Sequence, residues 1–498
     1  MAEHTRHKAC QISGLSIPRR IACSMVVLFL FSVPILAQTT WTAGAGTTQW
    51  NDAFNWSSGV PGGATPATIP TNPAGGPLFP ILNVNGTAGS LTIEAGATLG
   101  VSTNTLTVNG TITGAGTLNG DTGTVTVTGD FTVDTYNATT GNTNAGGNFT
   151  PGTFVHNNGT VVFTGALDPQ SIGAFTYRNV TLSKGGAALR VRLTGATTIT
   201  NTLTMTTGTL QLFGNALNLN SPLTMASANG TLNIGGTGPL NAGANTVTVN
   251  AGTIQVSTGT LSAGGLILGG GTYNATGAAT VTLGASGLSM TSGTITANAT
   301  SFSTSGNVSI TGGTFNENTS TLQMTGAGTT VRVTPARRLY NFTVAPGAGN
   351  TVSVSVDALS VAGTLTLTSG TLAAGALGTS VAGDFARTGG AYTSTGTLTF
   401  NGTAAQAFNP TGSTFGSLTV NNTGPATVTA SAGFALGGTL TLTSGTLAAG
   451  ANAVSLTGNF ARTGGAFTSS GTLTFTGGNA QAFAPTGSTF ANIEVNKA

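Results

Sequence analysis

Two long segments of the chain are near copies of each other. Residues 363–421 and 438–496 align without a gap at an offset of 75, and 43 of the 59 aligned positions are identical. A barrel or a sandwich does not easily accept such a duplication, because additional strands would break its closure. A solenoid accepts it, because each coil contacts only the neighbouring coils. The duplication therefore favours a solenoid.

Older copies of the unit lie upstream. Residues 147–182 keep the same order of Phe, Gly-Thr, Phe-x-Gly, Gln and a closing strand, and residues 319–344 keep the second half of the unit. We therefore expect repeats to occupy residues 81–498.

Short segments within each unit alternate between apolar residues and threonine. In residues 364–368, Leu365 and Leu367 alternate with three threonines, and a period of two residues places the leucines on one face of a strand. Pairs such as Ser369-Gly370 follow the strands and supply turns. The pattern predicts an all-β chain that forms a parallel β-helix, or β-solenoid. An array of β-sandwich repeats is the alternative.

The coil length sets the expected dimensions of such a solenoid. At roughly 20 residues per coil and a strand spacing of about 4.8 Å, some 20 coils would form a rod on the order of 100 Å long. Apolar residues would stack along its interior. The aromatic members of this stack in the two tandem copies are expected to be Phe385, Phe400, Phe408, Phe415, Phe460, Phe475, Phe483 and Phe490.

The first 37 residues have the pattern of a secretory signal peptide. Four basic residues precede an apolar run from Ile21 to Leu36, which is shorter than a membrane span and is followed by the small residue Ala37. We expect cleavage near Ala37 and therefore an extracellular or outer-surface location, with no membrane span in the mature chain. An uncleaved anchor is the alternative.

Removal of residues 1–37 changes the charge balance. This segment contains four of the 14 basic and one of the 11 acidic residues, so the remainder has ten of each, and it also contains both cysteines. The basic pI therefore gives no support for nucleic-acid binding. A chain without cysteine forms no disulfides and no thiolate metal site.

All three tryptophans lie at the start of the mature chain. Trp41, Trp50 and Trp56 fall within residues 38–80, a segment that ends in a Pro-rich stretch. We expect this segment to cap the open first coil, since the ends of a solenoid need covers. A platform of tryptophans that binds sugars is a second interpretation.

These features together resemble a protein family. The W-x8-W-x4-NW-x2-G-x-P opening and the GTLTF-x-G-x3-Q-x-F units look like the secreted β-solenoid proteins of bacterial surfaces, of the autotransporter-passenger and haemagglutinin-like adhesin type. The resemblance implies adhesion, surface coating or a matrix role, usually with a C-terminal export or anchoring module. The sequence departs from this pattern, with no outer-membrane barrel, sorting domain or wall-anchor motif before Ala498. Truncation is one interpretation, and the sequence does not predict the route of export or attachment.

Enzymatic chemistry has few residues available to it. Residues 193–316 contain no Asp, Glu, Lys, Arg or His, so this segment has no general acid or base. His156 is interpreted as a turn residue without catalytic partners. A polysaccharide-degrading β-helix enzyme would need clustered carboxylates, whereas Asp384 is replaced by Asn459 in its own duplicate. We therefore expect a non-enzymatic protein without a cofactor.

The remaining charges suggest two further hypotheses. Asp121, Asp130 and Asp134 could share a face and bind calcium, and a solvated acidic edge is the alternative. Four basic residues then follow within 15 positions, and such a girdle could support self-association with the acidic first third of another copy. They are Arg178, Lys184, Arg190 and Arg192.

The function expected from the sequence is that of an adhesin or structural surface protein. It would bind glycans or surfaces through a multivalent face rich in Thr and Asn. An ice-binding or self-assembling coat solenoid is the alternative, because rows of T-x-T such as Thr364, Thr366 and Thr368 could form a regular hydroxyl array.

Overall fold

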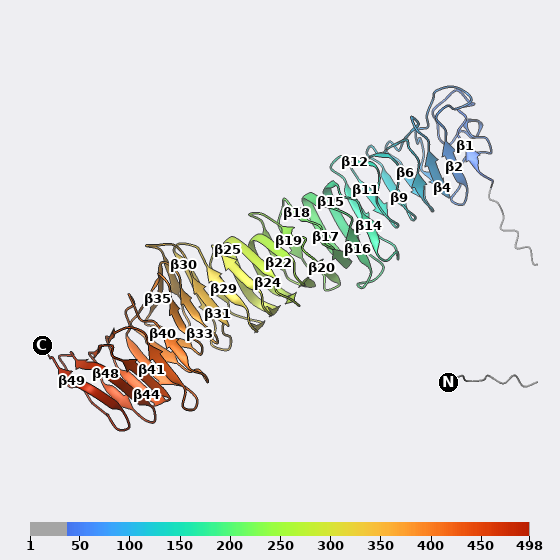
Figure 1. Cartoon of the computed structure of the whole chain (residues 1–498). Helices are drawn as coiled ribbons and strands as arrows, with labels where there is room; N and C mark the ends of the chain where they lie inside the picture. The colour runs from blue at the N-terminus through green and yellow to red at the C-terminus, as the bar shows by residue number, and fades with distance from the viewer. Residues whose placement is uncertain (1–36, 498) are drawn as a thin grey trace, which may run out of the picture.

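The chain folds into a rod of stacked parallel strands. A computed structural model describes residues 37–497, which form a β-solenoid of about 22 turns. The rod runs from β1 (Thr39–Thr40), in blue, to β49 (Thr489–Val495), in red (Figure 1). The predicted signal peptide lies outside the described residues, apart from Ala37. The predicted parallel β-helix is confirmed.

The register shows how one coil lies on the next. Thr105 of β6 (Thr105–Val108) pairs with Thr124 of β9 (Thr124–Val127), 19 residues later. Gly208 of β17 (Thr197–Gln211) pairs with Gly230 of β20 (Gly230–Ile234), 22 residues later. Every pairing between strands within residues 37–497 is parallel, so the array of sandwiches, which would pair antiparallel neighbours, is excluded.

Alternation in the sequence becomes alternation in burial. In β6, Leu106 and Val108 are fully buried, whereas Thr105 and Thr107 are half-buried on the outer face. Each buried aliphatic side chain of this kind stabilises the fold by about 2 kcal/mol. Because the pattern repeats in every coil, one continuous apolar column fills the rod.

The predicted phenylalanine stack exists in the first tandem copy. Phe385 lies 5.6 Å from Phe408 between ring centroids, and Phe408 lies 5.3 Å from Phe434 in the following coil. Six of the eight predicted phenylalanines are buried. The other two depart from the prediction, since Phe483 is 39% exposed and Phe490 is only partly buried. Within residues 37–497 no strand pairs beyond β49, so no coil covers them as Phe434 covers Phe408.

The opposite end is closed by a cap. It contains β1, the 3-10 turn η1 (Ala53–Asn55) and β2 (Pro66–Ile69). Trp56 packs edge-on against both Trp41 and Trp50, with ring centroids 5.2 and 4.8 Å apart. The indole of Trp41 donates a hydrogen bond to Leu78 O, and that of Trp56 donates one to Trp50 O. The predicted tryptophan cap is therefore present.

Candidate functional site

The tryptophans of the cap do not form an open binding platform. Trp41, Trp50 and Trp56 are 0%, 1% and 4% exposed. A sugar stacks on an exposed ring face, and none of these rings offers one. The exposed aromatic side chain of the cap is instead Phe54, at 83%.

The three candidate calcium ligands lie at separate corners of the coils. Asp121 precedes β9 and accepts a hydrogen bond from Ser102 N, whereas Asp130 follows β9 and accepts one from Asn148 N. Asp134 precedes β10 (Thr135–Asn137), where Thr135 Oγ1 donates to its carboxylate. No group of three His, Cys, Asp or Glu side chains within residues 37–497 is arranged to hold a metal ion. The structure therefore does not bring these carboxylates together.

The hydrogen bond that the Asp130 side chain accepts from a backbone N–H has counterparts in both tandem copies. Asp384 Oδ1 accepts a hydrogen bond from Ala407 N at 2.8 Å, and Asn459 Oδ1 accepts the equivalent bond from Ala482 N at 2.8 Å. The contact needs an oxygen acceptor and no charge. This explains why the duplication tolerates the exchange of Asp for Asn at this position.

His156 lies in a turn, as expected from the sequence. Its carbonyl accepts a hydrogen bond from Gly159 N, and its Nδ1 accepts one from Asn158 N at 3.1 Å. These contacts are local to the turn and give the imidazole a structural role.

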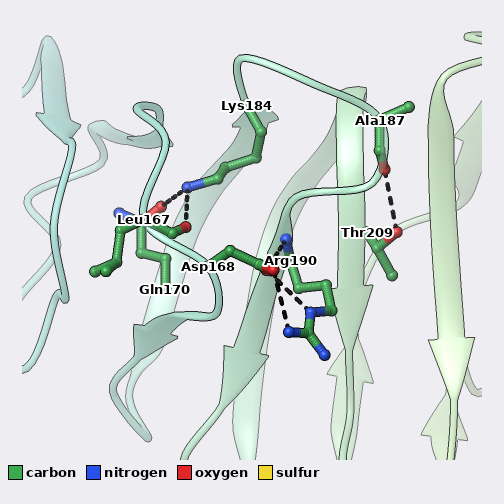
Figure 2. A network of polar contacts seen from close by, with 7 residues as sticks. All are labelled: Leu167, Asp168, Gln170, Lys184, Ala187, Arg190 and Thr209. Atoms are coloured by element: carbon green, nitrogen blue, oxygen red, sulfur yellow. Dashed lines mark hydrogen bonds and ion pairs between the residues drawn. The ribbon is translucent and has the colours of Figure 1, made fainter. Parts of the chain in front are cut away.

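The predicted basic girdle is largely occupied by internal contacts. Lys184 is 4% exposed, and its ammonium donates to Thr164 O at 2.9 Å. It also donates to Leu167 O and Gln170 Oε1 at 3.1 and 2.7 Å (Figure 2). Burial lowers the pKa of Lys184, while the nearby Asp168 opposes that shift. Lys184 therefore holds neighbouring segments together inside the rod, and we call Lys184 and Gln170 the clamp. The hypothesis that Lys184 pairs with the acidic first third of another copy is wrong for this residue, because its ammonium is buried.

Gln170, the second residue of the clamp, also contacts the preceding coil. Its structural role was not predicted from the sequence. Its amide nitrogen donates to Ala145 O and Gly147 O of the preceding coil. Gln406 and Gln481 make the same pair of contacts, to Val381 O and Gly383 O and to Leu456 O and Gly458 O. The sequence signal for this role was a single Gln that recurs at the equivalent place in these three copies of the repeat, among apolar and small residues.

The amide oxygen distinguishes the three copies. Gln170 Oε1 accepts from Lys184, whereas the Oε1 atoms of Gln406 and Gln481 are buried without a partner among the described residues. An unpaired buried acceptor destabilises a fold. The buried amide oxygen therefore has a hydrogen-bond partner in the older copy, at Gln170, and none among the described residues in the two tandem copies.

Asp168 and Arg190 form an ion pair beside the clamp. Arg190 donates to the carboxylate from its backbone N, Nε and Nη2 at 2.8, 2.9 and 3.1 Å (Figure 2). These hydrogen bonds, with that from the side chain the strongest, lower the pKa of Asp168 below its ordinary value.

This pair gives a prediction for acid conditions. Because the folded state lowers the pKa of Asp168, the pair stabilises the fold above the ordinary Asp pKa of about 3.9 and loses this effect as the pH falls through the lower folded-state value. We expect Asp168→Asn to lower the urea midpoint at neutral pH, and the difference from wild type to shrink in acid. Asp384→Asn is the control and should behave as wild type. A constant difference between neutral and acid pH would contradict the prediction.

A row of amide side chains runs along the outer face in the middle of the rod. Gln211 of β17, Asn233 of β20, Gln255 of β23 (Thr253–Val256) and Asn274 of β24 (Thr260–Ala275) are in register, one per coil. All four are half-buried, and none has a side-chain hydrogen bond within residues 37–497. Other amide rows are internally bonded, as in Asn241 Nδ2 to Asn218 Oδ1 at 2.9 Å. This row is thus free to bind a ligand.

A groove of about 590 Å³ lies beside this row. Its walls and floor are formed by Gln211, Phe213, Asn233, Gly235, Gln255 and Ser257, among others. Phe213 is 58% exposed, and the guanidinium carbon of Arg192 lies 3.2 Å from its ring centroid. The sequence did not reveal this site, because it depends on which turns the coils place side by side.

Comparison of the chain with protein-family models, curated proteins and solved structures found no match. No helix among residues 37–497 is long and apolar enough to cross a membrane.

Proposed function

We propose that this protein is a secreted or cell-surface, non-enzymatic adhesin or structural repeat protein that binds through a multivalent outer face. The main observation behind this proposal is the row of four amide side chains, one in each of four successive coils, that have no side-chain hydrogen bond among the described residues 37–497. Each such amide offers a donor and an acceptor to a ligand. Repetition at fixed spacing turns weak individual contacts into avidity.

The charge distribution supports the same proposal. Residues 193–316 carry no charged side chain, so this part of the rod does not steer a charged ligand over long distances. We therefore expect binding there to depend on hydrogen bonds and stacking, with little dependence on salt.

The alternative functions receive less support. An ice-binding face needs T-x-T in many consecutive coils. Thr105 and Thr107 stack on Thr124 and Thr126, but Asn144 follows Thr126 in the next coil. Thr366 likewise stacks between Thr343 and Ala386. A β-helix hydrolase needs paired carboxylates, and the acidic residues of the first third each serve a local turn or corner. Both observations favour the proposal of a binding or scaffold protein.

Binding by purified residues 38–498 to glycan arrays and to whole cells tests the proposal. We expect saturable binding that persists when calcium is chelated, because Asp121, Asp130 and Asp134 are not gathered into one site. A heat-unfolded sample is the control for adsorption. Absence of binding, with ordered fibres forming instead, would contradict the adhesin role and favour a coat protein.

A further inference from the structure

We propose that the groove beside Phe213 binds a linear, neutral polysaccharide that lies along the axis of the rod. This inference rests on the proposed function and specifies its ligand class and site. It is carried by an exposed, strained aromatic residue and a row of free amides that share one groove.

Phe213 combines a left-handed backbone with an exposed aromatic ring. Its φ is +51°, a left-handed backbone that is costly for a residue with a bulky side chain, and its ring is 58% exposed. The register of β17, β20 and β23 places Gly235 and Ser257 at the same turn of the next two coils. Small residues thus suffice at the same turn of the following coils, so closing the turn does not need the ring. Apart from its contact with Arg192, the ring is available to stack on a ligand.

The same contrast in size creates the groove. The ring of Phe213 stands as a wall at one coil, and Gly235, Gly236 and Ser257 leave space beside it in the following coils. Arg192 stacks on the ring at 3.2 Å and restricts its motion. A pre-positioned ring loses less conformational entropy when a ligand binds.

Gln211, Asn233 and Gln255 add polar recognition along the groove. Each amide can donate to one hydroxyl and accept from its neighbour. Successive amides are one strand spacing apart, about 4.8 Å, which is close to the length of one sugar ring in an extended chain. A polysaccharide along the axis would therefore meet equivalent amides at successive sugars, with the Phe213 ring under one sugar face.

Two observations favour a neutral glycan over other ligands. The residues that line the groove are all uncharged, so a polyanion would have only Arg192 nearby. An extended peptide would add to a free strand edge, but β20 is already paired with β17 and β23 on its two sides. A neutral chain of hydroxyl groups matches the uncharged donors and acceptors that are present.

Isothermal titration calorimetry of purified residues 38–498 tests this inference, with soluble galactomannan, hydroxyethyl cellulose and pectate as separate probes. We expect at least one neutral polysaccharide to bind the wild type and pectate to bind much more weakly. Phe213→Gly should weaken the apparent affinity about tenfold and leave the thermal unfolding midpoint unchanged or raised, because glycine accepts the left-handed backbone. Gln255→Val should also weaken binding. Phe54→Ala, which removes an exposed phenylalanine of the cap, is the matched control and should bind as wild type.

The outcomes separate this inference from the proposed function. If wild type and Phe213→Gly bind neutral polysaccharide equally, or if only pectate binds the protein, the groove assignment is wrong while an adhesin role stands. If wild type binds cells or other surfaces but neither neutral polysaccharide, the ligand class is wrong. If it binds no probe, glycan array or cell, both proposals fail.

Discussion

Replacing Gln170 by Leu is expected to lower the local free energy of unfolding by about 3 kcal/mol. The substitution removes one of the three acceptors of the buried Lys184 ammonium and the side-chain donor to Gly147 O and Ala145 O. Ala145 O keeps the hydrogen bond from Thr164 N. Coils of a solenoid can unfold locally, so the effect should be concentrated near the substitution. Hydrogen exchange of amides in β13 (Thr160–Phe163) and β15 (Thr176–Ser183) measures it.

The tandem copy supplies the matched control for this prediction. Gln406→Leu removes the same two hydrogen bonds to carbonyls, but Gln406 Oε1 has no partner to lose. We expect its effect on its own coil to be roughly half as large. Equal effects at the two sites would mean that the Lys184 ammonium does not depend on Gln170.

A double variant, Gln170→Leu with Lys184→Met, tests how much of the lost stability comes from the charged ammonium of Lys184. If Gln170→Leu is harmful because it leaves a poorly satisfied buried ammonium, then adding Lys184→Met should recover part of the lost stability. Strict additivity of the two single substitutions would show that the ammonium and the amide act independently.

Replacing Trp56 by Ala is expected to destabilise the N-terminal cap by about 4 kcal/mol. Trp56 is buried between Trp41 and Trp50 and donates a hydrogen bond to Trp50 O. Without it, the cap loses its central side chain and the edge of the first coil becomes accessible. Cleavage by chymotrypsin within residues 38–80 should therefore become much faster than in wild type.

Phe54→Ala is the control for the cap. Phe54 lies two residues from Trp56 but is 83% exposed, so its removal should change stability by less than about 0.5 kcal/mol. If Trp56→Ala left the cleavage of the cap as slow as in Phe54→Ala, the tryptophans would not be what holds the cap on the first coil.

The sequence alone determined the class of fold, because that information is local and repeated. The alternation of Leu365 and Leu367 with threonine specifies which face of a strand is buried, and the 75-residue duplication indicates coils that contact only their neighbours. The buried Phe385 and Phe408 follow from the same pattern. So does the cap, since Trp41, Trp50 and Trp56 occur together at one end of the repeats.

Only the tertiary structure decided which side chains meet between coils. Lys184 and Arg190 are similar as charges in the sequence, but one is a buried clamp on Gln170 and the other pairs with Asp168 at the surface. The groove of Phe213 likewise depends on Gly235 and Ser257 occupying the same turn in later coils. These contacts join residues about 14 to 44 positions apart in the chain, and their register depends on the length and conformation of every intervening turn, which no local pattern specifies.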